Sequence, residues 1–204
     1  MPGLESVGRI AVDVALLPSQ EMTDRVIEAN RLLVSKFGAE IALNKVDSLP
    51  HISLAMGCIV EKDITIIEKI LTTIAKENPL GTLQVVGVSI ATNAKGEQIS
   101  AFGLEKTRRL QSFHEQVMTR LQPYLSYDVT ADMVNAAEVS DSTLLWIKSY
   151  AKASSFARFL PHITIGYGQV NEVEPPIKFR ASKLALCHLG NHCTCTRILA
   201  SIDI

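Results

Sequence analysis

The chain has 204 residues, of which 47% are hydrophobic, 20% are charged and 5% are aromatic. This composition supplies enough apolar surface for a core, and it excludes a disordered chain, a collagen-like chain and a coiled coil. Lys and Arg number 20 and Asp and Glu number 21, so the formal net charge is −1. A chain this close to neutral has no overall field for gripping long duplex nucleic acid.

Strand and helix patterns alternate through the first half of the chain. The early apolar run, residues 10–17, is interrupted by Asp13 and is too short to span a bilayer. Apolar residues at helical spacing predict helices, and looser alternation predicts strands. In chain order we predict a strand over 10–16, a helix over 20–36, a strand over 51–60, a helix over 63–77, and a hairpin of 83–91 with 98–104 around residues 93–96.

The second half shows a similar mixture. Asp141 is a possible cap for one of its helices, in which four residues are expected to face inward: Leu145, Trp146, Tyr150 and Phe156. The elements expected are a helix over 107–121, an ambiguous segment over 124–139, a helix over 142–159, a strand over 162–167, a polar loop over 171–176, and a closing hairpin of 181–189 with 193–202. This irregular alternation predicts an α+β fold.

Two octapeptides, one in each half, are alike. Residues 50–57 read PHISLAMG and residues 161–168 read PHITIGYG, so the Pro, the His, the first Ile and the final Gly recur. A hydroxyl residue, Ser53 or Thr164, stands two positions after each histidine. The copies lie about half a chain length apart, which favours a duplication over two unrelated motifs.

Strand geometry gives these octapeptides a chemical meaning. Residues i and i+2 of a strand share a face, so His51 lies beside Ser53 and His162 lies beside Thr164. If the copies face each other, two imidazoles and two hydroxyls converge on a cradle suited to a phosphodiester. One imidazole can take a proton from water and the other can give one to the leaving oxygen, while the hydroxyls bind non-bridging oxygens. This chemistry requires no metal and no cofactor. The sequence does not assign which ring is the acid and which the base.

At these residues the chain resembles the 2H phosphoesterase superfamily, which is named for two H-x-[S/T] motifs and includes 2′-5′ RNA ligase-like proteins and cyclic phosphodiesterases. The octapeptides match specifically, and the coarse order of elements is compatible across nearly the whole chain. The resemblance implies one bilobal domain over residues 1–204, built as a pseudo-twofold duplication in which two antiparallel sheets face each other across a central cleft, with helices outside. It also implies metal-independent cleavage of a 2′,3′-cyclic nucleotide phosphate or an RNA-end phosphodiester. His51 and His162 would then be the catalytic acid/base pair, and Ser53 and Thr164 would bind the phosphate.

The expected partner is small. Because no basic patch is visible, we expect a small nucleotide or an RNA end with a cyclic phosphate, rather than long duplex nucleic acid or a membrane. We also expect a monomer. Few cysteines and no secretory signal favour the cytoplasm. The alternative function is a non-catalytic module that binds a nucleotide or an RNA end in the same cleft. A repeat kept only for packing is the structural alternative.

A cluster of thiols and imidazoles lies near the end of the chain. Residues 187–195 read CHLGNHCTC, whose spacing is not the pairing typical of structural zinc. On a hairpin, Cys187 and Cys193 could be neighbours. Packing or surface thiols are the favoured interpretation, and a metal site or a redox pair are the alternatives.

Two further side chains have expected positions. His114 lies within a predicted helix and is expected at the surface or at its boundary. Tyr167, by alternation, is expected to point away from the polar face of the second octapeptide and to pack. A glycine-associated bulge would reverse that orientation.

Overall fold

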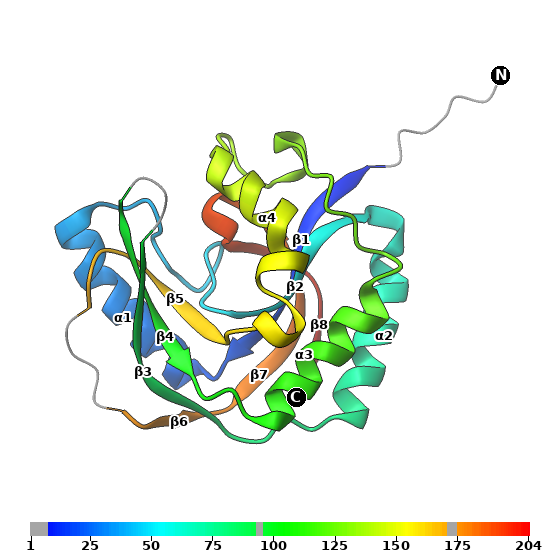
Figure 1. Cartoon of the computed structure of the whole chain (residues 1–204), viewed down its shortest axis with the longest axis horizontal. Helices are drawn as coiled ribbons and strands as arrows, with labels where there is room; N and C mark the ends of the chain where they lie inside the picture. Colours follow the sequence, from blue (N-terminus) through cyan, green and yellow to red (C-terminus); the bar gives the residue numbers. More distant parts are fainter. Residues whose placement is uncertain (1–7, 93–95, 171–174) are drawn as a thin grey trace.

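A computed structural model describes residues 8–92, 96–170 and 175–204. In this described part, two four-stranded antiparallel sheets combine with four α-helices, so the predicted α+β fold is confirmed (Figure 1). The first sheet has the order β2 (Ile52–Val60), β1 (Arg9–Pro18), β7 (Ala181–Leu189) and β8 (Cys195–Asp203). The second sheet has the order β5 (His162–Tyr167), β4 (Gln98–Leu104), β3 (Leu83–Thr92) and β6 (Ile177–Phe179).

Helices and short 3-10 turns connect these strands. The helices are α1 (Gln20–Phe37), α2 (Ile64–Glu77), α3 (Arg108–Leu121) and α4 (Asp141–Ala153). The 3-10 turns are η1 (Glu61–Asp63), η2 (Ala131–Met133), η3 (Phe156–Arg158) and η4 (Asn191–Cys193). Strand β6 is not indicated by the sequence pattern. Residues 93–95 of the predicted hairpin turn and residues 171–174 of the predicted polar loop lie outside the described residues.

One predicted helix is shorter than expected. The helix over 142–159 ends at Ala153, and its N-cap is Ser140, whose hydroxyl accepts from the Thr143 amide, rather than Asp141. The buried residues of α4 are Thr143, Ile147 and Tyr150. These three residues form one helical stripe, and side chains beside the stripe remain in solvent. Of the four residues expected to face inward, Tyr150 is buried, and the other three are exposed: Leu145, Trp146 and Phe156.

The two octapeptides share the same strand irregularity. The pairing of β1 with β2 shifts register at Leu54, and the pairing of β4 with β5 shifts at Ile165. Each octapeptide therefore carries a β-bulge at its fifth residue. Two sequences that match at only some positions thus take one backbone shape, as a duplication predicts.

A buried histidine forms a hydrogen bond with the backbone carbonyl of the first bulge. His114 of α3 is fully buried, so the expectation that it lies near the surface is wrong. Its Nδ1 donates to the Leu54 carbonyl at 2.8 Å, and its Nε2 accepts from the Phe156 amide at 2.8 Å. Its ring also stacks on Phe159 with centroids 4.0 Å apart. The bulge frees a carbonyl from the strand ladder, and His114 satisfies it.

A buried asparagine forms the equivalent hydrogen bond with the backbone carbonyl of the second bulge. Asn30 of α1 donates through Nδ2 to the Ile165 carbonyl at 2.7 Å and to the Ile41 carbonyl at 2.8 Å. Its Oδ1 accepts from the Leu43 amide at 2.9 Å. Asn30, in the first half of the chain, therefore binds the motif strand of the second half and the loop before the first motif. His114, in the second half, binds the motif strand of the first half and the segment before the second motif.

His114 makes the stability of the fold sensitive to acid. Burial lowers the pKa of His114 to about 4, although its hydrogen bond to Leu54 raises that pKa. The unfolded ring titrates near 6.5, so unfolding takes up a proton between these values and stability falls as the pH falls through this window. A shift of this size corresponds to at most about 3 kcal/mol. We expect urea unfolding between pH 7 and pH 4 to show a steeper loss for the wild type than for His114→Gln; parallel curves would contradict this assignment.

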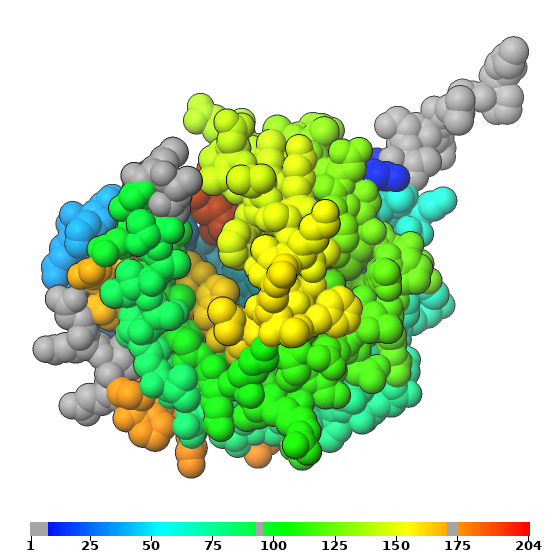
Figure 2. Space-filling model, in the orientation of Figure 1, coloured from blue at the N-terminus to red at the C-terminus, as the bar shows by residue number. Residues whose placement is uncertain are grey.

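The edge strands of the two sheets bring the octapeptides together. Strand β2 ends the first sheet and β5 ends the second, and their Cα atoms approach within 8 Å. Helix α3 packs on β2, α2 on β8 and α1 on β5 (Figure 1). Figure 2 shows a hollow between the β3–β4 hairpin and the α4 region, with atoms coloured as β5 and η4 in its depth. None of the described helices is long and apolar enough to cross a membrane.

Candidate functional site

The predicted alternation of the motif strands is confirmed. The residues next to the two histidines, Ile52 and Ile163, are completely buried. The four predicted site residues are half-buried: His51, Ser53, His162 and Thr164. Each octapeptide therefore anchors one face in the core and leaves an imidazole and a hydroxyl on the other face.

Both imidazoles are held in the same way. Nδ1 of His51 lies 2.8 Å from the Leu49 carbonyl, and Nδ1 of His162 lies 2.8 Å from the Leu160 carbonyl. A carbonyl oxygen can only accept, so Nδ1 carries the hydrogen in both rings. In the neutral state each ring therefore presents an unprotonated Nε2, and this nitrogen is available for proton transfer.

The two rings lie within electrostatic range of each other. Burial lowers the pKa of His51 below its ordinary value, the hydrogen bond to Leu49 raises it, and charge on His162 lowers it further. The influence of His162 means that protonation of one ring disfavours protonation of the other. A pair that carries a single proton can supply one acid and one base.

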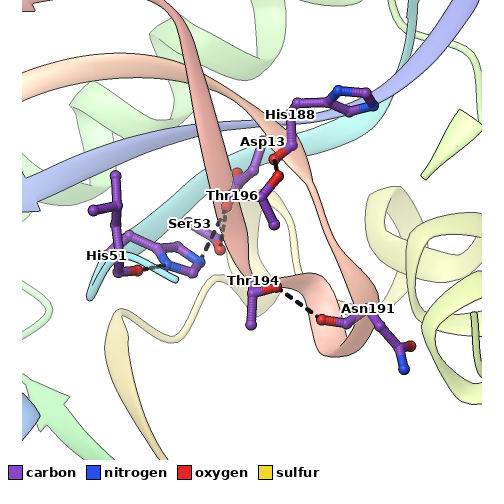
Figure 3. A network of polar contacts seen from close by, with 8 residues as sticks. Asp13, His51, Ser53, His188, Asn191, Thr194 and Thr196 are labelled. Carbon is purple, nitrogen blue, oxygen red and sulfur yellow. Dashed lines mark hydrogen bonds and ion pairs between the residues drawn. The ribbon is translucent and has the colours of Figure 1, made fainter. Parts of the chain in front are cut away.

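Asp13 is a site residue that the sequence analysis missed. It lies on β1, is completely buried, and accepts a hydrogen bond from the Ser53 hydroxyl at 2.5 Å (Figure 3). Its Oδ2 is 3.6 Å from Nε2 of His51, and its Oδ1 makes no hydrogen bond within the part of the chain that the structure describes. Burial raises the pKa of Asp13 to about 8, while the hydrogen bond from Ser53 and the nearby backbone of Ala55 lower it.

The carboxyl group distinguishes the two halves of the site. Asp13 stands opposite Met56, and the matching position opposite Tyr167 is occupied by Ile99. Only the first of these two equivalent positions therefore offers a carboxyl. The signal for Asp13 was present in the sequence, because it is the one charged residue within the predicted strand 10–16, and buried acids are uncommon unless they have a partner.

Tyr167 is turned toward the cleft face. Because the bulge shifts the register, Tyr167 stands opposite Ile99 and Thr164 stands opposite Ala101, which lies two residues along on the same face of β4. The expectation that Tyr167 points away is therefore wrong. The β-bulge reverses its orientation, as the alternative prediction stated. Its hydroxyl lies 3.3 Å from Nδ1 of His192 in η4, so this pair connects the second motif strand to the first sheet.

The cysteine–histidine run does not converge on one site. Nε2 of His188 lies 3.0 Å from the Met133 carbonyl, and Figure 3 shows its ring turned away from Asp13. His192 lies against Tyr167, as described above. Cys195, rather than the predicted Cys193, packs with Cys187 in one buried cluster.

Small side chains form the inner face of the first sheet beneath the polar residues. Ala15 stands opposite Ser53, so these two residues share a face. A separate buried cluster continues from Ala15 across this sheet: Ala15, Leu17, Ala185, Cys187 and Cys195.

Neither the protein-family models nor the curated proteins include a match to this chain. The interpretation of the site therefore depends on its own geometry. That geometry offers two imidazoles whose Nε2 atoms are unprotonated in the neutral state and two hydroxyls, together with a buried carboxyl beside His51. Acid/base catalysis at a bound anion is the chemistry that such groups can perform.

Proposed function

We propose that this chain is a metal-independent phosphodiesterase of the 2H phosphoesterase type. Its substrate is a 2′,3′-cyclic nucleotide phosphate or a phosphodiester at an RNA end. The observation that supports this function best is the equivalence of the two motifs. Both stand on edge strands that approach each other, and both hold the histidine by Nδ1 so that Nε2 of the neutral ring is unprotonated.

The reaction follows from the positions of these groups. One imidazole takes a proton through Nε2 from a water molecule, whose oxygen attacks the phosphorus atom. The protonated partner imidazole gives its proton to the departing ribose oxygen as the phosphorus–oxygen bond breaks. Thr164 donates a hydrogen bond to a non-bridging oxygen, where negative charge grows in the transition state, and Ser53 does the same once its hydroxyl hydrogen turns from Asp13 to the phosphate. One proton is taken up and one is released, so the pair returns to a state with the same number of protons.

The net charge of the chain supports a small substrate, and its free cysteines support a reducing compartment. The formal net charge is −1, which provides no field for a long polyanion. All four cysteines are free thiols, and free thiols persist in the cytoplasm, where we propose that the enzyme works. A single copy of the chain supplies both motifs, so the proposed active unit is a monomer.

The two hydroxyls are expected to contribute unequally. The Ser53 hydroxyl is already engaged by Asp13, whereas the Thr164 hydroxyl has no hydrogen bond to any residue that the structure describes. We expect Thr164→Val to lower kcat by about 100-fold, as for the loss of one transition-state donor. Ser53→Ala should lower kcat by about tenfold. Initial rates would measure the loss of kcat in both variants, with Thr72→Ala on α2 as the control. Thr164→Ser should restore activity, because it keeps the hydroxyl. Equal losses of kcat in Thr164→Val and Ser53→Ala would contradict the unequal contribution of the two hydroxyls.

The function itself is tested by turnover. The purified chain would be incubated in the presence of a chelator with 2′,3′-cyclic nucleotides, with an oligoribonucleotide that ends in a cyclic phosphate, and with a 2′-5′ linked dinucleotide. We expect at least one of them to be hydrolysed to a phosphomonoester or to two nucleosidic fragments. Binding without turnover would favour the non-catalytic module, and neither binding nor turnover would contradict the proposal.

A further inference from the structure

Three potential metal ligands converge beside the first motif from three different strands. Asp13 belongs to β1, His51 immediately precedes β2, and Cys195 begins β8. A carboxylate oxygen, an imidazole nitrogen and the thiol sulfur all lie within 4.8 Å of one another. Asp13 and Cys195 are fully buried, and 12% of the His51 side chain is exposed. The imidazole is thus the part of this cluster that solvent reaches.

The separation of the imidazole and the carboxylate suits a shared cation. Nε2 of His51 and Oδ2 of Asp13 are 3.6 Å apart, which is too long for a hydrogen bond. Zinc bonds to nitrogen or oxygen of about 2.0–2.1 Å, at tetrahedral to trigonal angles, place two ligand atoms about 3.3–3.6 Å apart. The Leu49 carbonyl holds Nδ1, as outer-shell partners of metal-bound histidines commonly do.

The surroundings of the Asp13 carboxylate and the Cys195 thiol also suit metal binding. Oδ1 of Asp13 is buried without a hydrogen-bond partner among the described residues, while Ser53 holds Oδ2. The Leu49 amide donates to the Cys195 carbonyl at 3.0 Å, so Leu49 positions both the His51 ring and the start of β8. Tetrahedral zinc places a sulfur and a nitrogen ligand about 3.5 Å apart. The ligand atoms therefore need to approach one another by no more than about 1.3 Å.

We propose that Asp13, His51 and Cys195 bind Zn²⁺, and that zinc bound there inhibits the enzyme. A set of nitrogen, oxygen and sulfur donors favours zinc over Mg²⁺ and Ca²⁺, which prefer oxygen ligands. Binding displaces the thiol proton of Cys195 and the carboxyl proton of Asp13 to solvent, and it occupies the lone pair on Nε2 of His51. That lone pair is the one that proton transfer uses, so the inhibitory part of this proposal rests on the proposed function, whereas the metal site does not.

Metal binding is tested without any substrate. Reduced, chelator-treated protein would be titrated with Zn²⁺ by calorimetry and with Co²⁺ by absorption spectroscopy. We expect one ion per chain, and the cobalt complex should show a near-ultraviolet thiolate-to-metal charge-transfer band. Weak binding at several sites, or a cobalt spectrum without the thiolate band, would overturn the site even if no variant could be purified.

Variants identify the ligands. Cys195→Ala and Asp13→Asn should each weaken zinc binding by at least about 100-fold, since even outer-shell changes cost about 10–100-fold. Cys58→Ala, which removes a buried thiol elsewhere in the same sheet, is the matched control and should bind as the wild type does. Unchanged affinity in folded Cys195→Ala would overturn the proposal.

The inhibitory role has its own test. Saturating zinc should lower the hydrolysis of the identified substrate by at least about tenfold, because the His51 lone pair is blocked, and a chelator should restore the rate. In Cys195→Ala, zinc should leave that variant's own metal-free rate unchanged. Zinc bound without inhibition would overturn the regulatory part. If no substrate is hydrolysed, the calorimetric and cobalt experiments still decide the metal site, so failure of the function and failure of the site are distinguishable.

Discussion

Replacing either motif histidine by alanine is expected to lower hydrolysis of the cyclic phosphate by about 10²–10⁴-fold, the usual contribution of a positioned acid or base. His51→Ala removes the ring beside Asp13, and His162→Ala removes its counterpart on β5. Because the two rings act as a unit, the double variant should lose little more than either single variant. Initial rates for the three variants would be compared with those of the wild type.

The control for these variants is another imidazole in the same structure. His188→Ala removes a ring that contacts the Met133 carbonyl and faces away from Asp13 (Figure 3), so its rate should stay close to that of the wild type. Urea unfolding would verify that each variant is folded. If folded His51→Ala and folded His162→Ala both hydrolyse at the wild-type rate, the acid/base assignment is wrong.

The second large effect is expected on stability. Asn30 is buried and makes three hydrogen bonds, all to backbone groups of other segments. Asn30→Ala leaves two carbonyls and one amide without their partner, and each buried unpaired group costs about 1–3 kcal/mol. We therefore expect the free energy of unfolding to fall by about 3 kcal/mol or more. Urea unfolding measures the change.

The equivalent residue provides the comparison. His114→Ala leaves the Leu54 carbonyl and the Phe156 amide unpaired, so it should destabilise the protein by about 2–4 kcal/mol. Glu28→Ala, at an exposed position of α1, should change stability by less than about 0.5 kcal/mol. If Asn30→Ala lowers the free energy of unfolding no more than Glu28→Ala does, Asn30 does not stabilise the second bulge. The inference that each half of the chain stabilises the motif strand of the other half would then be wrong.

The faces of the motif strands could be predicted because a strand has a period of two. Ile52 and Ile163 had to share the face opposite the histidines, and the structure confirms this arrangement. Tyr167 could not be placed in this way, since a bulge is a property of the paired strands and one strand alone does not specify it. Alternation is reliable up to the bulge and reverses after it.

His114 shows that residue type can mislead where spacing does not. It follows Leu110 by four positions and precedes Val117 by three, so it lies on the buried stripe of α3. The expectation of a surface position came from the polarity of imidazole, and the free carbonyl that pairs with it belongs to a strand distant in the sequence. Asp13 is a similar case, since its partners Ser53 and His51 are known only after β1 and β2 have paired.

The central claim is that the two octapeptides hold one phosphate group between them. Titration of the ¹⁵N-labelled protein with a 2′- or 3′-nucleoside monophosphate, followed through the imidazole resonances, tests it directly. We predict that the side-chain signals of His51 and His162 shift together along a single saturation curve with one Kd. Shifts confined to one ring, or two curves with different Kd values, would contradict a shared phosphate.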